Sequence, residues 1–319
     1  RAELQVVADL EAFSETVAGW HSTKGGTDLQ RAVEWYSEYV KCYAAADGEP
    51  PDPLFIRPLR SDLKVAFECL GSEGYRVPRS GPENTMFDLV AGDVVLDGGG
   101  NIGAFARWAV SRGAAAVDVY EPAGAEGGGT TWELLRRNCR GARFRLRARG
   151  LGARAATVAF VDCEAARSGA TRSMVATEDR YSSSWTKGAR RFDVPVVCFD
   201  DALPGHDVVK LDIEGSEREI LDVQHAWDRT RLLMFEYSAQ RCRKDGEGWR
   251  RFANALNHLA AGGFTHAWLP PNAYRRDFWE EGGGRGLDLN VWAFREAADP
   301  RWMHRAKGEI STEAFQRLE

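Results

Sequence analysis

The chain has 319 residues, which is enough for one large α/β domain with extensions or for two small domains. Hydrophobic residues make up 44% of it, so a sizeable core can form, and the formal net charge of −5 argues against nucleic acid as the main partner. The sequence holds no apolar run of roughly 18 residues and no signal-peptide pattern. We therefore expect no transmembrane segment and a soluble protein, cytoplasmic or organellar. Removal of an N-terminal targeting segment stays open.

Residues 1–60 are predicted to form a helical extension ahead of the main domain. Two amphipathic patterns are separated by Gly25-Gly26, and the proline-rich stretch Glu49–Pro53 ends the second one. A lid over a binding site and a packing appendage are equally consistent with such a segment. Two short apolar runs follow, Leu63–Phe67 and Met86–Val90, and they predict strands or a hairpin before the core.

The most informative stretch begins at Asp93. The apolar run Val94–Leu96 ends in Asp97, the turn residues Gly98, Gly100 and Gly103 follow, and a helical pattern then begins. A strand, a glycine turn and a helix form the nucleotide-binding opening of a doubly wound fold. Glycine allows close backbone approach, and the helix N-terminus offers unpaired N–H groups.

Two cofactors are consistent with this turn. Gly98, Gly100 and Gly103 satisfy G-x-G-x-x-G, and a second strand, Ala116–Tyr120, ends in an acid, Glu121, at the spacing of a ribose-binding carboxylate, which favours NAD. Asp97 favours S-adenosylmethionine (SAM) instead. A carboxylate directly under the turn repels a pyrophosphate, but it attracts the ammonium of SAM, directly or through water.

The chain from Glu121 to residue 200 is predicted to continue the α/β alternation. A glycine-rich loop, residues 124–129, is either a mobile flap or a surface insertion, and a helix carrying Trp132, Leu135 and Asn138 follows it. Residues 142–161 predict two strands around a turn at Gly150–Ala153. Tyr181–Trp185 is either a loop over the active site or an ordinary exposed loop.

A second ionisable cluster follows a strand at residues 194–199 and a short helix that Asp200 is placed to cap. The central strand Asp207–Ile213 carries Lys210, Asp212 and Glu214 on one face of a period of two. Buried ionisable groups are costly unless they are paired or bind a ligand, and ligands bind at the carboxyl ends of such strands. A simple Lys210–Asp212 ion pair is the alternative.

The remaining elements complete a sheet. A helix is predicted over residues 215–227, then a buried strand, residues 232–237, that carries the further acid Glu236, then a helix over residues 249–261. Two strands at residues 264–269 and 289–294 predict a closing antiparallel hairpin. The tail from Glu296 predicts a surface helix.

Four motifs in this order resemble the FkbM family of SAM-dependent methyltransferases. They are Val95–Gly103, Tyr120–Pro122, Phe199–Leu203 and, most diagnostic, Lys210–Glu217. The resemblance covers roughly Asp62 to Arg295. It implies a class I methyltransferase, an α/β fold with a doubly wound, mostly parallel, Rossmann-like sheet closed by an antiparallel C-terminal hairpin. We expect a helical extension at residues 1–60, the methyltransferase domain at 61–295 and a tail at 296–319.

The resemblance also implies roles for individual residues. The methionine end of SAM is expected at Asp97, Gly98, Gly100, Asn101 and Gly103, the ribose at Glu121, and the adenine edge near Gly150 and Leu151. Methylation of a hydroxyl oxygen requires a proton acceptor. The catalytic candidates are Asp212, Glu214 and Glu236, in that order, with Lys210 beside them.

The family usually passes directly from Glu-Pro into a helix, so the glycine-rich loop 124–129 is a departure from its pattern. A divalent cation held by Asp212 and Glu236 is a less favoured alternative to a carboxylate base. The six cysteines have no metal-ligand spacing, and we expect no zinc site.

The expected products are a methylated hydroxyl group, on a small molecule or a sugar, and S-adenosyl-L-homocysteine (SAH). Two other functions stay open from the sequence. An NAD(P)-dependent oxidoreductase fits only the first half of the domain. A non-catalytic binding or scaffold subunit fits the altered loop and the long N-terminal segment, but a fold kept only for packing has little reason to hold acids such as Asp97, Glu121 and Asp212 at one sheet edge. The sequence does not define the acceptor or the oligomeric state.

Overall fold

A computed structural model describes ten stretches of the chain. They are residues 54–56, 60–71, 74–75, 89–124, 130–162, 172–173, 190–238, 248–269, 288–295 and 310–311. Most of the predicted extension over residues 1–60, the loop from residue 125 to 129, the Tyr181–Trp185 stretch and most of the C-terminal tail lie outside these stretches. The proposed domain boundaries therefore stay predictions.

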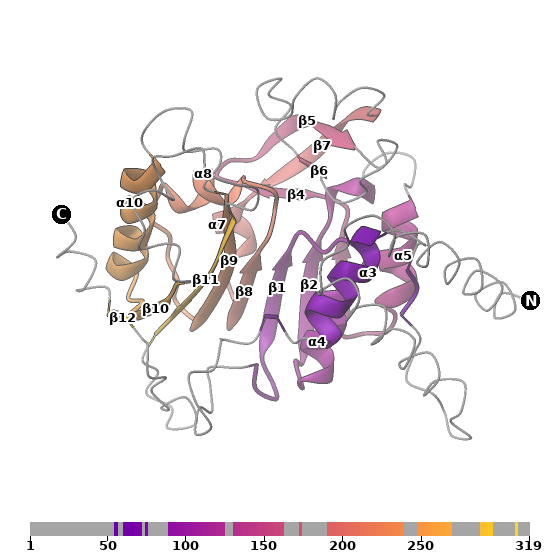
Figure 1. Ribbon diagram of the computed structural model, residues 1–319, viewed down its shortest axis with the longest axis horizontal. Coiled ribbons are helices and arrows are strands. Elements are labelled where there is room, and N and C mark those ends of the chain that lie inside the picture. The colour runs from indigo at the N-terminus through magenta and orange to yellow at the C-terminus, as the bar shows by residue number, and fades with distance from the viewer. Residues whose placement is uncertain are drawn as a thin grey trace, which may run out of the picture.

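The main layer is an eight-stranded sheet (Figure 1). From edge to edge its strands are β12 (Ile310–Ser311), β10 (His266–Trp268), β11 (Asp288–Phe294), β9 (Leu232–Ser238), β8 (Val208–Leu211), β1 (Val94–Gly98), β2 (Ala116–Tyr120) and β3 (Phe144–Arg147). The strands β3, β2, β1, β8 and β9 are parallel, and β11 runs antiparallel to both β9 and β10. The doubly wound, mostly parallel fold and its closing antiparallel hairpin are thus confirmed.

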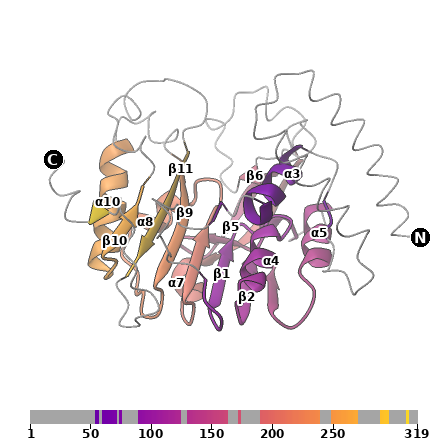
Figure 2. The same cartoon turned by 60° about the horizontal axis from the view of Figure 1, so that its bottom comes forward.

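Helices cover both faces of this sheet (Figures 1 and 2). One face carries α3 (Arg60–Ala66) with the π-helical turn η1 (Phe67–Gly71), α4 (Ala104–Ser111) and α5 (Thr130–Asn138). The other face carries α7 (Phe199–Ala202), α8 (Glu217–Leu221) and α10 (Gly248–Ala261). A short 3₁₀ helix, η2 (Pro122–Gly124), follows β2.

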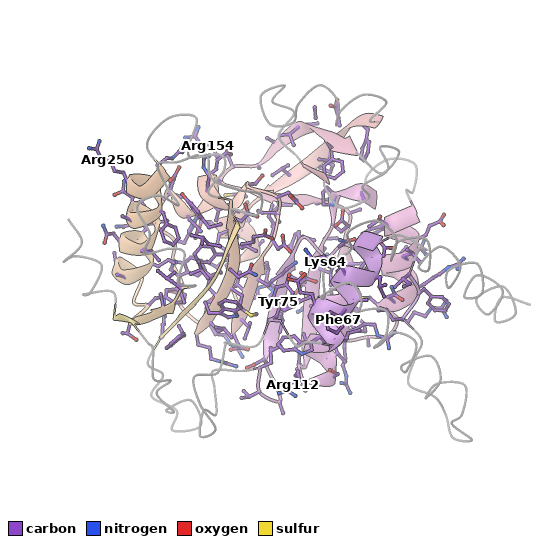
Figure 3. The ribbon with its side chains drawn as sticks, viewed as in Figure 1. Lys64, Phe67, Tyr75, Arg112, Arg154 and Arg250 are labelled. Atoms are coloured by element: carbon purple, nitrogen blue, oxygen red, sulfur yellow. The ribbon has the colours of Figure 1, made fainter. Side chains whose placement is uncertain are left out.

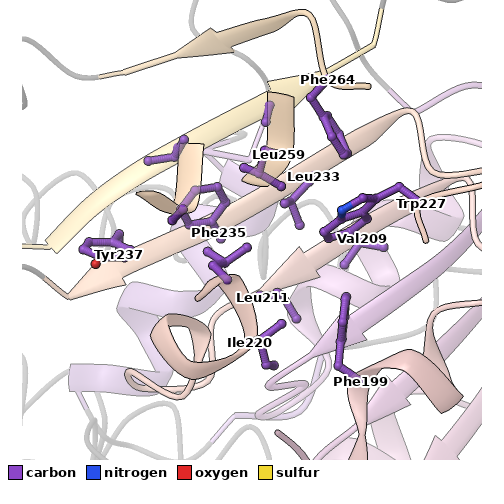
Figure 4. Close-up of a cluster of buried hydrophobic side chains, with 14 of the residues drawn as sticks. Phe199, Val209, Leu211, Ile220, Trp227, Leu233, Phe235, Tyr237, Leu259 and Phe264 are labelled. Carbon is purple, nitrogen blue, oxygen red and sulfur yellow. The ribbon is translucent and has the colours of Figure 1, made fainter. Parts of the chain in front are cut away.

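The central strands contribute to both cores because successive side chains point to opposite faces. Leu96 of β1 packs with the α8 and α10 side, where Phe199, Trp227 and Phe264 form an aromatic group (Figure 4). Val95 packs with the α4 side. Strands buried on both faces read as continuous apolar runs, which is why β1 and β8 were predictable from sequence.

A second sheet of four strands, in the order β4-β7-β5-β6, follows the first half of the main sheet. Its strands are β4 (Gly150–Gly152), β5 (Ala156–Asp162), β6 (Arg172–Ser173) and β7 (Arg190–Cys198). Both strands predicted in residues 142–161 are present, as β3 and β5, but the turn predicted between them was wrong, because Gly150–Gly152 is itself a strand that pairs in parallel with β7.

Other local predictions were also wrong. The run Leu63–Phe67, expected as a strand, lies in α3 and η1, because its apolar residues pack against α4 as a helix. Asp200 does not cap α7, whose N-cap residue is Cys198; the Asp200 carboxylate contacts the ring of His225 instead. In the tail, Ile310–Ser311 pairs with β10 as a strand rather than a helix.

Candidate functional site

The glycine turn lies at the carboxyl end of β1, and its glycines are required by the protein's own packing. Gly99 has a φ of 81°, and a Cβ there would lie 1.9 Å from the Asp212 carbonyl oxygen. A Cβ on Gly100 would lie 2.2 Å from Val119 Cγ1, and one on Gly103, φ 86°, would lie 2.5 Å from Cys139 Sγ. We expected the glycines to make room for a ligand, whereas their Cβ positions face neighbouring elements.

The N–H groups of this turn are bonded within the protein. Gly99 N and Gly100 N donate to the Tyr120 carbonyl oxygen at 3.0 and 3.1 Å, and Gly103 N donates to Gly100 O at 2.7 Å. Asn101 N donates to Glu121 Oε2 at 2.9 Å. A phosphate-binding turn presents such groups to its ligand. Here four of them already have acceptors.

Glu121 is held at the end of β2 against this turn. Besides the bond from Asn101, its Oε1 accepts a hydrogen bond from Ala123 N at 2.9 Å, and the residue is 5% exposed. Two backbone donors therefore fix both carboxylate oxygens. The predicted ribose-binding acid thus lies where the spacing placed it, directly beside the turn.

Asp97 and Lys210 form a buried ion pair between β1 and β8. The two residues are direct partners in the parallel register, and Lys210 Nζ lies 3.1 Å from Asp97 Oδ1. Lys210 also donates to the carbonyl oxygens of Gly98 and Gly99, at 3.1 and 2.8 Å. The alternative, a Lys210–Asp212 ion pair, is also present, with Lys210 Nζ 3.8 Å from Asp212 Oδ2, but Asp97 is the nearer partner.

Burial and the opposite charge of the partner act against each other in both members of this pair. Burial raises the pKa of Asp97, against the lowering effect of Lys210. It works to lower the pKa of Lys210, but the charges of Asp97 and Asp212 together raise that pKa above its usual value. The charged form of Lys210 is therefore favoured under the glycine turn. Two aromatic rings, those of Phe105 and Tyr75, lie 5.6 and 5.8 Å from its Nζ.

Asp212 lies in the turn that follows β8. This strand ends at Leu211, so the predicted alternation through Asp212 and Glu214 was wrong in detail. Asp212 N donates to Gly98 O at 3.1 Å, and its side chain is 28% exposed. Glu214 has a φ of 56°, a conformation rare for residues other than glycine and frequent at functional sites.

Tyr75 was missed by the sequence reading. Its hydroxyl donates to Asp212 Oδ2 at 3.0 Å, and its carbonyl accepts from Trp292 Nε1 on β11 at 3.2 Å. Figure 3 shows Tyr75 beside α3, on the sheet face that carries α4. No local motif marks a tyrosine that follows η1, so only the fold brings it to the site.

Glu68 of η1 also lies near this cluster. Burial is the main cause of its raised pKa, and the charge of Asp212 raises it further. No role was predicted for Glu68 from the sequence, because it lies just after the predicted strand Leu63–Phe67 and belongs to no motif.

The remaining predicted residues are distributed along the same edge. Gly150 and Leu151, expected near the adenine edge, are both buried, and the Leu151 side chain packs under Gly98. Glu236 lies on β9 opposite Asn290 of β11. In the part of the chain that the structure describes, no group of three or more His, Cys, Asp or Glu side chains has a metal-binding arrangement.

The family of the chain follows from a match to the methyltransferase FkbM domain over residues 101–265. This is more than half of the 319 residues. The chain belongs to the FkbM methyltransferase family. The match begins inside the glycine turn, at Asn101, and it includes Glu121, Lys210, Asp212, Glu214 and Glu236. Asp97 and Tyr75 precede it.

Solved structures resemble this FkbM domain in fold at low sequence identity. An FkbM methyltransferase from Methylobacillus flagellatus is 14% identical, with a TM-score of 0.39, over 73% of this chain and 53% of that one. An S-adenosylmethionine-dependent methyltransferase from Mesorhizobium loti is 13% identical, with a TM-score of 0.35, over 66% and 94%. A Listeria monocytogenes protein assigned to the same class is 12% identical, with a TM-score of 0.37, over 73% and 99%. A search of curated proteins gave no match.

The helices in the described stretches of this FkbM methyltransferase were also compared with the length and hydropathy that a membrane span requires. None of them is long and apolar enough to cross a membrane.

Proposed function

We propose that this FkbM methyltransferase uses SAM and transfers its methyl group to a hydroxyl oxygen of a small molecule or a sugar. The observation that carries the choice of cofactor is the internal bonding of the glycine turn. Because Gly99, Gly100 and Asn101 donate their N–H groups to Tyr120 and Glu121, the turn has little left to offer a pyrophosphate. This favours SAM over NAD.

The residues at the carboxyl edge fit SAM in charge and in shape. Glu121 is a fixed acceptor for ribose hydroxyl groups, and the glycine turn provides a close backbone surface. Asp212 adds a partly exposed carboxylate for a cationic ligand. When bound, SAM supplies an electrophilic methyl group on its sulfonium.

The acceptor hydroxyl must lose a proton during or after the transfer, and a carboxylate within hydrogen-bond reach can take it. Asp212, Glu214 and Glu236 are the candidates in the FkbM domain, and the first two belong to the turn after β8. A divalent cation at Asp212 and Glu236 is the less favoured route, because the described residues add no third ligand to this pair.

Titration calorimetry on the full chain tests the cofactor. SAM and SAH are expected to bind, and NAD is not. Replacing Glu121 with Ala should weaken SAM about tenfold or more, the cost of losing hydrogen bonds to a charged group. Absence of SAM and SAH binding would overturn the proposal, and tight NAD binding would favour an oxidoreductase. Labelled methyl transfer to a panel of sugars and small hydroxyl compounds then identifies the acceptor.

A further inference from the structure

Two aspartates at the carboxyl edge differ in their access to a ligand. Asp97 was expected to attract the ammonium of SAM, but its side chain is fully buried and Lys210 already provides a cation 3.1 Å away. Its Oδ2 has no hydrogen-bond partner among the described residues, yet it is not at the surface. A ligand cation therefore gains little from Asp97.

Asp212 has the opposite properties. Its side chain is 28% exposed, and Lys210 lies farther from it, at 3.8 Å. Only one of its oxygens, Oδ2, is bound by described residues, through the Tyr75 hydroxyl. The other oxygen, Oδ1, has no partner in the described part of the chain. Its negative charge is thus only partly compensated at the place where ligands bind in this fold.

Tyr75 determines how Asp212 presents that oxygen. The tyrosine is held at two points: Trp292 Nε1 donates to its carbonyl, and its ring packs edge-on against Phe105 with centroids 4.9 Å apart. The preceding residue is fixed as well, since Gly74 N donates to Glu68 O at 2.7 Å. A hydroxyl fixed in this way keeps Asp212 Oδ2 in one position. A carboxylate with one oxygen fixed can turn little, so Oδ1 keeps a constant direction.

We propose that Asp212, positioned by Tyr75, binds the ammonium group at the amino-acid end of the cofactor. This inference rests on the proposed use of SAM and replaces Asp97 in that role. Asp97 and Lys210 instead compensate each other and hold the glycine turn. With Asp212 engaged in this way, Glu214 and Glu236 remain of the three named candidates as proton acceptors for a substrate hydroxyl.

Calorimetry with three ligands tests this assignment without an acceptor substrate. SAM and SAH both contain the ammonium group, and 5′-methylthioadenosine shares their adenosine and sulfur but lacks the amino acid. Asp212→Asn keeps the shape of the side chain and removes its charge, so SAM and SAH should bind about ten- to hundredfold more weakly. Tyr75→Phe should weaken both about three- to tenfold. Neither change should alter the affinity for 5′-methylthioadenosine by more than about twofold.

Two control variants test whether weaker binding is specific to Asp212 and Tyr75 or follows from any similar substitution in the protein. Tyr237→Phe removes the hydroxyl of a fully buried tyrosine on β9 that packs against Phe252, and Asp200→Asn removes an exposed acid of α7. Both should bind all three ligands as the wild type does. Unchanged SAH binding in Asp212→Asn would overturn the inference, and so would a loss confined to SAM, which would indicate the sulfonium instead. If the wild type bound neither SAM nor SAH, the proposed function itself would fail.

Discussion

Aspartates lie at both ends of the central strands β1 and β8, but the cations that pair with them differ between the two ends. Asp93 precedes β1 and Asp97 is the last residue but one of that strand, whereas Asp207 precedes β8 and Asp212 follows it. At the amino edge each acid has an arginine of its own. Arg231 pairs with Asp93, and Arg229 makes a bidentate contact with Asp207 at 2.5 and 3.0 Å.

The carboxyl edge is arranged differently, because Asp97 and Asp212 share one cation, Lys210. The amino-edge acids also accept backbone hydrogen bonds, from Val90 to Asp93 and from Val94 to Asp207. At the amino edge the charge of each aspartate is balanced by an arginine, and these contacts hold the neighbouring loops against the sheet. An edge with two acids and one cation retains negative charge, which suits it to a positively charged ligand.

Removing the shared cation should have the largest effect. Lys210→Met leaves Asp97 buried without a countercharge and two carbonyl groups without a donor, so we expect the free energy of unfolding to fall by about 3–5 kcal/mol. Urea denaturation followed by tryptophan fluorescence measures it. At the amino edge, Arg229→Met should cost only about 1 kcal/mol or less, because the Arg229 side chain is 56% exposed.

The double variant Asp97→Asn with Lys210→Met checks the cause of that loss. It removes both charges, and we expect it to be clearly more stable than Lys210→Met alone. If Lys210→Met were as stable as Arg229→Met, the comparison between the two edges would be wrong.

Glycine substitutions at the two edges should have the next largest effect on stability. Gly99 at the carboxyl edge and Gly92 at the amino edge both have a positive φ, 81° and 98°. A Cβ on Gly92 meets no atom within 4 Å, whereas one on Gly99 overlaps the Asp212 carbonyl. Gly92→Ala should therefore cost about 1–2 kcal/mol, for φ alone, and Gly99→Ala about 3 kcal/mol or more. Equal costs in thermal or urea unfolding would show that the turn at Gly99 is not packed tightly against the turn at Asp212.

A smaller effect should depend on pH. Burial raises the pKa of Glu68, next to the carboxyl edge, above its ordinary value of 4.5. The protonated form is thus favoured in the folded state, and the stability that Glu68 contributes is present below pH 4.5 and is lost as pH rises through the folded-state pKa. Glu68→Gln should match the wild type near pH 4 and be the more stable of the two at pH 7. The gain at pH 7 measures the shift directly, since each pKa unit corresponds to about 1.4 kcal/mol. A gain that is the same at both pH values would contradict this origin.

The smallest change is expected at Glu214, whose positive φ of 56° lies in the turn beside Asp212. Glu214→Gly relieves the backbone strain but adds freedom to the unfolded chain, so stability should rise by about 0–1 kcal/mol. The matched control Glu219→Gly, at an exposed position in α8, should lose about 1 kcal/mol. Differential scanning calorimetry can resolve the opposite signs, and a loss in both variants would argue against strain at Glu214.

Local pattern was sufficient for much of the fold and for part of the site. The predicted strand Ala116–Tyr120 coincides with β2, and Glu121 lies beside the glycine turn, because strand periodicity and motif spacing are both short-range properties. The strand expected at Leu63–Phe67 failed because tertiary packing against α4 decides between helix and strand for a short apolar run.

The partners of the site residues were harder to predict, since they depend on which strands are neighbours. The sequence grouped Lys210 with Asp212, two residues away, whereas the register of β1 against β8 places it opposite Asp97. Tyr75 reaches Asp212 across 137 positions of the chain, a distance over which no motif extends.

The bonds of Lys210 also bear on the order in which the molecule assembles. The glycine turn is held by a side chain that comes 111 residues later than Gly99, so the first half of the chain carries the recognisable motif but not the group that holds it in shape. Contacts between such distant segments form slowly because their loops must close first. The binding edge is thus completed only after the second half has docked, and a ligand of that edge would stabilise the finished molecule and not its partly folded forms.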